Sequence, residues 1–313
     1  MISVALCTYN GEKYIGQQLD SILLQSMPVD EIVVLDDNSQ DSTFDVLSEY
    51  AKKYQQIRLI RNEVNIGYRK NFERALVESK GEYIFFSDQD DVWHPGKVKE
   101  SIDYLQTSGK LGAFTDADLI NQDGSSLETS LFIHQNLIPY IENELLQKYI
   151  FEILSLKGNF VTGATLVVTK EAKDLIIPFR TSKGIAHDEW IALKLSSLQK
   201  LGYINKKLMS YRIHPSQQLG LDLRQGQRKD DLLDCFFSKG DVRHLIRMRR
   251  GTAGMIKVCG FKHKEKKILF LMYFGLLKRC LSKNIIQRAS QIFHFLVIEL
   301  FVFLRSKISY HLY

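Results

Sequence analysis

Residues 83–91 read YIFFSDQDD, an apolar, strand-like run that ends directly in a cluster of acidic residues. Strand-like runs of the same kind occur upstream, at residues 2–8, 31–35 and 57–61. Apolar side chains at helical spacing fill the intervals, at residues 14–25, 42–54 and 70–79. Pro95 suits the first turn of a further helix that extends to about residue 105. This regular alternation predicts parallel β-α-β units, in an α/β sheet with helices on both faces.

Polar residues follow all four strand-like runs, in the segments 8–10, 36–39, 62–67 and 88–91. Ligands of open α/β sheets bind outside the carboxyl ends of the strands, so we expect these segments to meet at one cleft. The second half of the chain is less regular. Its segments read as an insertion without a clear assignment at residues 127–150, a helix at 187–199 and a final strand or hairpin at 203–213.

The composition indicates one large domain, or one domain with a smaller appendage, because 45% of the 313 residues are hydrophobic and 25% are charged. The cysteines are far apart and form no CxxC pair, which argues against a disulfide framework or a zinc site and favours a reducing cytoplasm. They are Cys7, Cys235, Cys259 and Cys280. Residues 1–8 are apolar but short and lack a basic segment, as expected of a buried first strand rather than a signal peptide.

The charge is distributed unevenly along the chain. Residues 1–238 carry 26 Lys and Arg against 33 Asp and Glu, whereas residues 239–313 carry 16 against 3. An acidic body with a basic tail predicts a domain boundary between residues 238 and 239. It also predicts that the tail meets an anionic partner, either nucleic acid or a membrane surface.

The acidic cluster at residues 88–91 is the sharpest chemical signal. Carboxylates packed at a strand end repel one another unless a cation joins them, and hard divalent ions take oxygen ligands and bridge to phosphate oxygens. An Asp-x-Asp turn formed by Asp88 and Asp90 can hold Mg²⁺ or Mn²⁺ against a diphosphate and neutralise its charge as it leaves. The alternative is a solvated turn that caps the helix near Pro95. The flanking apolar strand and Val92-Trp93 favour the metal site.

Two further turns are candidates for nucleotide binding. In the turn after the second strand, Asp41 or Ser42 can cap the next helix while Asp37 accepts hydrogen bonds from a nucleobase or from ribose hydroxyls. The segment Asn65-Ile66-Gly67 reads as a tight turn that needs glycine. Gly67 either lets the backbone approach the nucleotide or simply terminates a loop, and taken in isolation the second interpretation is favoured.

Two acids begin the helix predicted at residues 187–199. The helix dipole favours an acid there for structural reasons alone, but a carboxylate in a cleft is also a common general base, which takes a proton from an attacking hydroxyl. Asp188 is the candidate base and Glu189 the alternative. His214 is a candidate metal ligand or diphosphate contact, because Arg212 beside it would complete an anion site. A lone His is more often a surface residue.

These segments, in this order, resemble family 2 glycosyltransferases of the GT-A fold, a Rossmann-like domain that binds nucleotide sugars. The resemblance runs from residue 2 to about residue 216, and its most specific motifs are DQDDVW and HDEW. The matching segments are residues 5–11 (ALCTYNG), 34–39 (VLDDNS), 65–67 with Asn71, 86–93 (FSDQDDVW), 158–163, 187–190 (HDEW) and 211–214 (YRIH).

The resemblance implies an inverting enzyme that uses a nucleoside diphosphate sugar. Asp88 and Asp90 would hold Mn²⁺ or Mg²⁺, and the acceptor hydroxyl, deprotonated by Asp188, would attack C1 opposite the leaving diphosphate. The residues expected to bind the nucleotide sugar are Thr8, Tyr9, Asn10, Asp37, Asn65, Gly67, Asp88, Gln89 and His214. Within the family the chain looks most like bacterial rhamnosyltransferases of O-antigen or capsule assembly. That likeness implies a dTDP-rhamnose donor, with UDP-galactose or UDP-glucose as alternatives.

The tail, residues 239–313, falls outside the resemblance and contains two apolar runs, residues 268–277 and 292–304. Neither reaches the roughly 20 residues of a spanning helix, whereas basic flanks suit helices that lie in the headgroup region of an anionic leaflet. We therefore expect a helical extension that attaches a cytoplasmic enzyme to the inner face of the plasma membrane, near a lipid-linked acceptor. The alternative is a helical pair packed on the catalytic domain or on a second subunit of a homo-oligomer. Nucleic-acid binding is disfavoured because no aromatic residues interleave with the basic ones.

Two other classes of function remain as alternatives. A hydrolase or pyrophosphorylase could use a similar nucleotide-binding domain, but residues 8–13 (TYNGEK) lack the Gly-rich, basic phosphate loop that a pyrophosphorylase would be expected to have. A non-catalytic nucleotide-binding scaffold at the membrane is the second alternative. Such a protein would have no need of Asp188.

Overall fold

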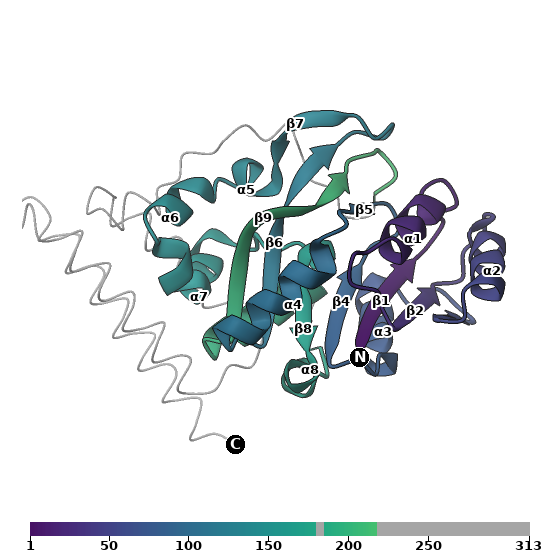
Figure 1. Ribbon diagram of the computed structural model, residues 1–313, viewed down its shortest axis with the longest axis horizontal. Coiled ribbons are helices and arrows are strands. Elements are labelled where there is room, and N and C mark those ends of the chain that lie inside the picture. The colour runs from purple at the N-terminus through teal and green to yellow at the C-terminus, as the bar shows by residue number, and fades with distance from the viewer. Residues whose placement is uncertain (180–184, 218–313) are drawn as a thin grey trace, which may run out of the picture. The chain divides into compact units, whose positions relative to one another are not determined.

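A computed structural model describes residues 1–179 and 185–217. Within these residues a mixed sheet forms the centre of the fold (Figure 1), with strand order β3-β2-β1-β4-β8-β6-β9-β5 and with β7 paired to β6. The strands are β1 (Ile2–Thr8), β2 (Glu31–Asp36), β3 (Ile57–Arg61), β4 (Tyr83–Ser87), β5 (Val92–Trp93), β6 (Gly112–Ile120), β7 (Ser126–Ser130), β8 (Val167–Thr169) and β9 (Leu201–Arg212).

The predicted parallel β-α-β units are confirmed in the first half of the chain. β1 pairs in parallel with β2 on one side and with β4 on the other, and β2 pairs in parallel with β3. β1 and β2 are buried along their whole length, which explains why they read as continuous apolar runs rather than alternating ones. The helices of this half are α1 (Ile15–Leu23), α2 (Thr43–Lys53), α3 (Tyr68–Glu78) and α4 (Lys97–Ser108).

The second half adds antiparallel pairing to the sheet. β8 lies antiparallel between β4 and β6, and β9 runs parallel to β6 and antiparallel to β5. Residues 201–212 form one long strand rather than a hairpin, and the register between β6 and β9 shifts opposite residues 115–118. Pro95 precedes α4 instead of opening it, because Gly96 is the N-cap residue and the helix begins at Lys97. Figure 1 shows α4 crossing β6 and β9.

The insertion that the sequence left unassigned contains β7 and short helices. The helical elements of this half are α5 (Leu131–His134), α6 (Ile138–Glu142), α7 (Leu145–Lys157), the 3-10 turn η1 (Gly163–Thr165), α8 (Lys170–Ile176) and α9 (His187–Ser197). α9 is buried on nearly all sides, as expected of a helix without an amphipathic pattern. It packs against α7, α8, α3 and β9, and these contacts hold its N-terminus in place.

The tail predicted at residues 239–313, with both of its apolar runs, lies outside the described residues. Its helices, its membrane contact and the proposed boundary at residue 238 therefore stay predictions. In the part of the chain that the structure describes, no helix is both long enough and apolar enough to cross a membrane.

Candidate active site

A cavity of about 360 Å³ opens where β1, β2 and β4 end. The strand register brings these ends together, because Thr8 lies opposite Asp36 and Leu6 lies opposite Ser87. The predicted site residues that line the cavity are Thr8, Tyr9, Asn10, Asp37, Asp88, Gln89, Asp90 and Asp188. The other predicted site residues, Asn65, Gly67 and His214, do not line it. Three of the four polar segments thus meet at one cavity, as expected for parallel strands.

The loops that follow β1 and β2 are fastened to each other. The backbone N–H of Asn10 donates to Ser39 Oγ at 3.0 Å, and the side-chain oxygen of Asn10 accepts from Gln40 N at 2.8 Å. One residue on, Gly11 N donates to Thr43 Oγ1 at 2.7 Å. Hydrogen bonds of this kind between two loops fix both of them, so the cavity wall formed by Tyr9 and Asn10 is preorganised.

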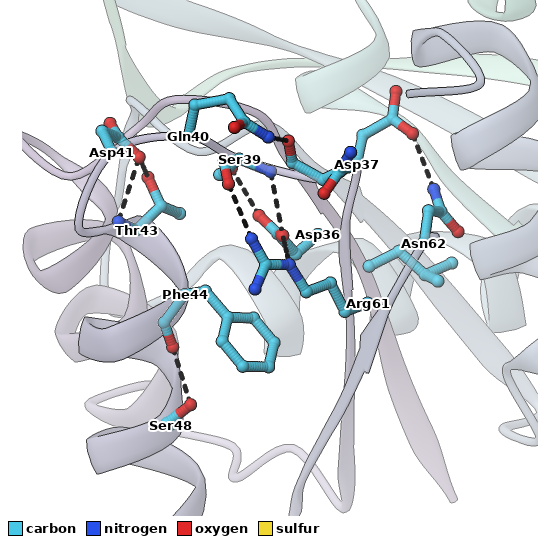
Figure 2. Close-up of polar contacts among 12 residues, drawn as sticks. Asp36, Asp37, Ser39, Gln40, Asp41, Thr43, Phe44, Ser48, Arg61 and Asn62 are labelled. Carbon is cyan, nitrogen blue, oxygen red and sulfur yellow. Dashed lines mark hydrogen bonds and ion pairs between the residues drawn. The ribbon is translucent and has the colours of Figure 1, made fainter. Parts of the chain in front are cut away.

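The two adjacent acids at the end of β2 have different roles. Figure 2 shows Asp36 beneath the loop, where its carboxylate accepts hydrogen bonds from Ser39 N and Oγ and lies 3.4 Å from Arg61 Nε. Arg61 also donates to Ser39 O at 2.7 Å, and its guanidinium lies 4.5 Å from the centre of the Phe44 ring. Asp36 is fully buried, so it shapes the loop and leaves Asp37 to face the cavity.

Helix α2 begins at the capping site that the sequence indicated. Asp41 accepts hydrogen bonds from the backbone N–H and the hydroxyl of Thr43, as Figure 2 shows. Ser42 is the N-cap residue by position but makes no side-chain capping bond. Of the two candidates, Asp41 therefore supplies the side-chain bond at the start of α2.

Asp37 connects the cavity to the loop after β3. Its Oδ1 accepts from Asn62 Nδ2 at 2.7 Å and from Ile66 N at 2.9 Å, while its Oδ2 accepts from Gly67 N at 2.9 Å. Asn62 also donates to Asn71 Oδ1 at 2.8 Å. Gly67 has a φ of 82°, a left-handed conformation in which glycine meets no steric penalty.

Asn65 is exposed, and its side-chain oxygen accepts from Gly67 N at 3.1 Å. Residues 65–67 therefore act on the cavity through the carboxylate of Asp37, which they orient, rather than as part of its wall. The direct nucleotide contact expected for Asn65 and Gly67 stays a prediction, since neither residue lines the cavity.

The side chain of Gln89 is engaged within the protein. Its Oε1 accepts from Thr8 Oγ1 and from Tyr9 N, both at 2.7 Å, and its Nε2 donates to Tyr9 O at 3.2 Å. These bonds join the acidic turn after β4 to the end of β1. The middle residue of the Asp-Gln-Asp sequence thus sets the spacing between two walls of the cavity.

Burial and neighbouring charges raise the pKa of two acids in the turn after β4, Asp88 and Asp91. Burial, followed by the charges of Asp90 and Asp188, raises the pKa of Asp88 to about 8. The pKa of Asp91 is also raised well above its usual value, by burial and then by Asp90 and Asp88. The ammonium of Lys97 opposes both shifts. This crowding of carboxylates predicts that a cation binding here would be stabilised by their charge.

Lys97 is fully buried in the interior of the fold. Its Nζ donates to Ala164 O at 2.6 Å and to Met209 Sδ at 3.1 Å, and it lies 4.4 Å from the centre of the Trp93 ring. Burial lowers the pKa of Lys97 to about 7, although Asp91 and Asp88 favour its charged form. Lys97 thus donates its hydrogen bonds to Ala164 and Met209 rather than to a carboxylate of the acidic turn.

The acidic side chains at the cavity fit a divalent ion that takes some of its ligands from the protein and the others from a bound phosphate group. No three His, Cys, Asp or Glu side chains among residues 1–179 and 185–217 are grouped so as to hold a metal by themselves. Mg²⁺ sites in phosphate-transfer proteins commonly use one or two carboxylates and take further ligands from water and substrate phosphates. Asp88 and Asp90 provide two carboxylates at the cavity, and Asp91 Oδ2 is buried with no hydrogen-bond partner among the described residues.

Arg212, at the end of β9, fixes the backbone of the acidic turn. It is 2% exposed, its Nε donates to Asp90 O at 2.8 Å, and its own N–H donates to Asp91 Oδ1 at 3.0 Å. The guanidinium also donates to Gln17 Oε1 at 2.7 Å and lies 4.6 Å from the centre of the Tyr14 ring. Arg212 thus acts through backbone positioning rather than as the exposed anion site expected from its sequence.

His214 contacts the acidic turn from the segment after β9. Its Nε2 is hydrogen-bonded to Asp90 Oδ2 at 2.9 Å, and its ring centre lies 4.9 Å from that of Tyr14. His214 is therefore a partner of a predicted metal ligand, and Ser216 and Gln217 just beyond it line the cavity.

The two candidate bases on α9 differ in position. Asp188 lines the cavity, and its Oδ2 accepts from Gly163 N at 3.1 Å while its Oδ1 accepts from Glu189 N at 2.7 Å. Burial raises the pKa of Asp188 to about 6, and the charge of Glu189 contributes to the shift. Glu189 does not line the cavity. The geometry therefore favours Asp188 as the group that meets a ligand.

Several cavity residues were not predicted from the sequence. They include Tyr68 and Phe72 on α3, His187 at the start of α9, and Ser216 and Gln217 after β9. His187 directly precedes the predicted base Asp188, and this position was the sequence feature that could have indicated it as a cavity residue. The positions of the others depend on how α3 and the end of β9 pack, and no local pattern reveals that.

Comparison with known proteins is consistent with this geometry. The family described as Glycosyl transferase family 2 matches residues 3–171. The putative teichuronic acid biosynthesis glycosyltransferase TuaG of Bacillus subtilis is 29% identical, over 68% of this chain and 79% of its own length. The dTDP-rhamnosyl transferase RfbG of Shigella flexneri is 30% identical, over 70% of this chain and 74% of its own.

Solved structures share the fold. TarS 1-349 from S. aureus in complex with UDP has a TM-score of 0.54 at 18% identity, covering 90% of this chain and 72% of its own. Mannosyltransferase PcManGT from Pyrobaculum calidifontis, in complex with GDP-Man and Mn²⁺, has a TM-score of 0.50 at 15% identity, covering 96% and 80%. At these identities the likeness concerns the fold alone.

We expect Gln89→Leu to lower the free energy of unfolding by about 1–3 kcal/mol. The Thr8 hydroxyl and the Tyr9 N–H, both partly buried, would lose the oxygen that accepts their hydrogen bonds. Gln40→Leu is the matched control, since Gln40 is exposed and its amide donates to Asn38 O. Urea denaturation of both variants measures the difference. Unchanged stability in Gln89→Leu would show that the side chain does not join the two walls.

Proposed function

Because the chain belongs to glycosyl transferase family 2, we propose that it is an inverting, metal-dependent enzyme that transfers a sugar from a nucleoside diphosphate to a hydroxyl acceptor. The described domain has the GT-A fold, and the chain is a glycosyltransferase. The donor, the metal ion, the acceptor and the roles of single residues belong to the proposal.

One observation carries the proposal: a candidate base and a pair of candidate metal ligands line the same cavity. Asp188 comes from α9, whereas Asp88 and Asp90 follow β4. The charge of Asp188 contributes to the raised pKa of Asp88, so the two sides lie within electrostatic range. A direct displacement needs this arrangement, with a base on the acceptor side and a charge-binding group on the diphosphate side.

The nucleoside is assigned to the end of the cavity formed by the loops after β1 and β2. Thr8, Tyr9, Asn10 and Asp37 line that end, and the hydrogen bonds between the loops fix its shape. Asn65 and Gly67 support it by orienting Asp37.

Asp88 and Asp90 would hold Mn²⁺ or Mg²⁺, with His214 orienting Asp90. When bound, such an ion supplies positive charge that stabilises the departing diphosphate. Arg212 keeps the acidic turn in place by binding the backbone oxygen of Asp90. Asp91 lies outside the cavity wall, where its Oδ1 accepts from the N–H of Arg212.

Asp188 would act as the general base. Its carboxylate takes the proton of the acceptor hydroxyl while the acceptor oxygen bonds to C1 of the sugar. The bond between C1 and the diphosphate oxygen breaks with its electron pair on the diphosphate, and the anomeric configuration inverts. The backbone N–H of Gly163 holds Asp188 by a 3.1 Å hydrogen bond during this step.

We assign the reaction to bacterial surface polysaccharide synthesis, because two relatives are described as enzymes of teichuronic acid biosynthesis and of dTDP-rhamnose transfer. A dTDP-rhamnose donor is favoured, with UDP-galactose or UDP-glucose as alternatives. The acceptor would be a lipid-linked saccharide, reached from the inner face of the plasma membrane through the basic tail at residues 239–313.

Nucleotide binding should depend on a divalent ion. UDP or dTDP with Mn²⁺ or Mg²⁺ should stabilise the protein by about 2.7 kcal/mol at a hundredfold excess over the dissociation constant, as measured by thermal unfolding. Asp90→Ala should abolish the effect of the metal, whereas Asp103→Ala on the exposed face of α4 should not. If neither nucleotide shifted the unfolding transition of the wild type with either metal, the proposed donor site would be refuted and a non-catalytic scaffold favoured.

Asp188→Asn should lower kcat by about 10²–10⁴-fold, because the amide cannot accept the acceptor proton, while nucleotide binding remains. Glu189→Gln, one residue away and outside the cavity wall, should retain most of the activity. Release of the nucleoside diphosphate in the presence of acceptor measures both. The opposite pattern, with an active Asp188→Asn and an inactive Glu189→Gln, would assign the base to Glu189.

With Mn²⁺ at saturation, so that Asp88 and Asp90 are ionised as metal ligands, the acid limb of kcat/KM should lie near pH 6, because the enzyme must also have Asp188 ionised and its pKa is raised to about 6. Activity should therefore be full above this pH and fall as Asp188 is protonated below it. Glu189→Gln should move the limb to lower pH, since the charge of Glu189 contributes to the raised pKa. A pH profile in which this variant leaves the limb unmoved would exclude Asp188 as its source.

A further inference from the structure

His187 is a buried polar side chain that lines the cavity and whose ring nitrogens make no hydrogen bond to any described residue. It is 5% exposed and lines the cavity at the first residue of α9. Within the described residues, neither Nδ1 nor Nε2 has a partner. Buried polar atoms in native proteins are almost always paired, and leaving one unpaired destabilises the fold. Both nitrogens are covered in the ligand-free protein, so a ligand that displaces part of the cavity wall as it enters would satisfy one of them.

Aromatic side chains hold the imidazole ring in place. The ring stacks on Phe72, with centres 4.1 Å apart and planes at 19°, and lies nearly parallel to Phe179 at 6.4 Å. Tyr68 meets it edge-on at 6.0 Å. Burial, with a smaller effect of Arg69, lowers the pKa of His187 to about 3. The ring is therefore neutral at ordinary pH, with one nitrogen that donates and one that accepts.

The ring lies between the nucleoside end of the cavity and the candidate base. On one side is α3, which carries Phe72 and the neighbouring Asn71. The side-chain amide of Asn62 donates both to Asn71 and to Asp37, so α3 is connected to the nucleoside end. On the other side is Gly163, at which an added Cβ would come within 2.8 Å of His187 Nε2. Gly163 in turn donates to Asp188. The space between a bound nucleoside and the base is where the transferred sugar must lie.

We propose that His187 binds a hydroxyl group of the donor sugar and thereby contributes to the choice of donor. This inference rests on the proposed function of the same cavity. A hydroxyl both donates and accepts, so it can pair with whichever nitrogen of a neutral imidazole faces it. A phosphate oxygen only accepts and is bound best by a cation, which this ring is not. The acceptor is assigned to the side of Asp188, and the donor to the side of α3 on which the ring stacks.

The test compares His187→Phe with the wild type in binding UDP, dTDP, UDP-glucose, UDP-galactose and dTDP-rhamnose, each with Mn²⁺. His187→Phe should bind UDP and dTDP within about twofold of the wild type. It should lose about tenfold in affinity for the preferred nucleotide sugar, equivalent to about 1.4 kcal/mol. Its melting temperature should equal or exceed that of the wild type, because two unpaired buried nitrogens are removed. His187→Gln, which keeps a donor and an acceptor, should lose less affinity.

His94→Phe is the matched control. His94 lies outside the cavity, and both of its ring nitrogens have partners, at Lys207 O and Ser210 Oγ. This variant should lower the melting temperature and leave the preference for the nucleotide sugar over the nucleotide unchanged.

Donors that lack one hydroxyl identify the group that His187 binds. One deoxy analogue of the preferred donor should bind the wild type about tenfold more weakly than the preferred donor does. The same analogue and the preferred donor should bind His187→Phe with equal affinity.

The proposal is overturned if His187→Phe keeps the wild-type affinity for nucleotide sugars, or loses affinity equally for nucleotides and nucleotide sugars. A fall in melting temperature like that of His94→Phe, or a failure to fold, would also overturn it. A wild type that binds no nucleotide would refute the proposed function itself, whereas a wild type that binds nucleotide sugars through other residues would refute this inference alone.

Discussion

The crowding of carboxylates after β4 is the constraint on which the rest of the site depends. Asp88, Asp90 and Asp91 fall within four residues, and burial, followed by the charges of neighbouring acids, raises the pKa of Asp88 and Asp91. Three basic side chains lie near this turn, one from the next helix, α4, and two from the end of β9 and the segment after it. Lys97 lies in the interior, Arg212 binds the turn backbone, and His214 binds Asp90. The final strand β9 is thereby tied to the end of β4, and residues 213–217 are brought to the cavity.

The parallel half of the sheet supplies the rigid support for this turn. β1 is buried between β2 and β4, so the ends of these strands cannot move independently. The loops beyond them are joined through Asn10 and Ser39, and the amide of Gln89 joins the end of β1 to the acidic turn. Hydrogen bonds made before any ligand arrives reduce the ordering that binding requires. The antiparallel second half positions α9, whose N-terminus carries Asp188 and His187.

Adjacent residues of the same type have different roles throughout the site. Asp36 is buried beneath its loop while Asp37 faces the cavity, and Asp188 lines the cavity while Glu189 does not. Gln89 lies between two candidate metal ligands but uses its amide within the protein. In each case the role depends on which side of a strand end or helix the side chain leaves. One residue further along, a side chain leaves a strand on the opposite face and leaves a helix about 100° around its axis, so residue type and neighbourhood together do not predict its role.

The sequence by itself determined the α/β class, the parallel β-α-β units of residues 2–87 and three of the four segments expected at the cavity, residues 8–10, 36–39 and 88–91. These depend on local hydrophobic periodicity and on the rule that parallel strands end at one edge of a sheet. The tertiary structure decided the pairing of β8 and β9, the division of the insertion at residues 127–150 and the indirect roles of Asn65 and Gly67. It also decided that His187 is buried among aromatic rings at the cavity wall. Those features arise from contacts between residues far apart in the chain, and long-range packing leaves no periodic signal in the local sequence.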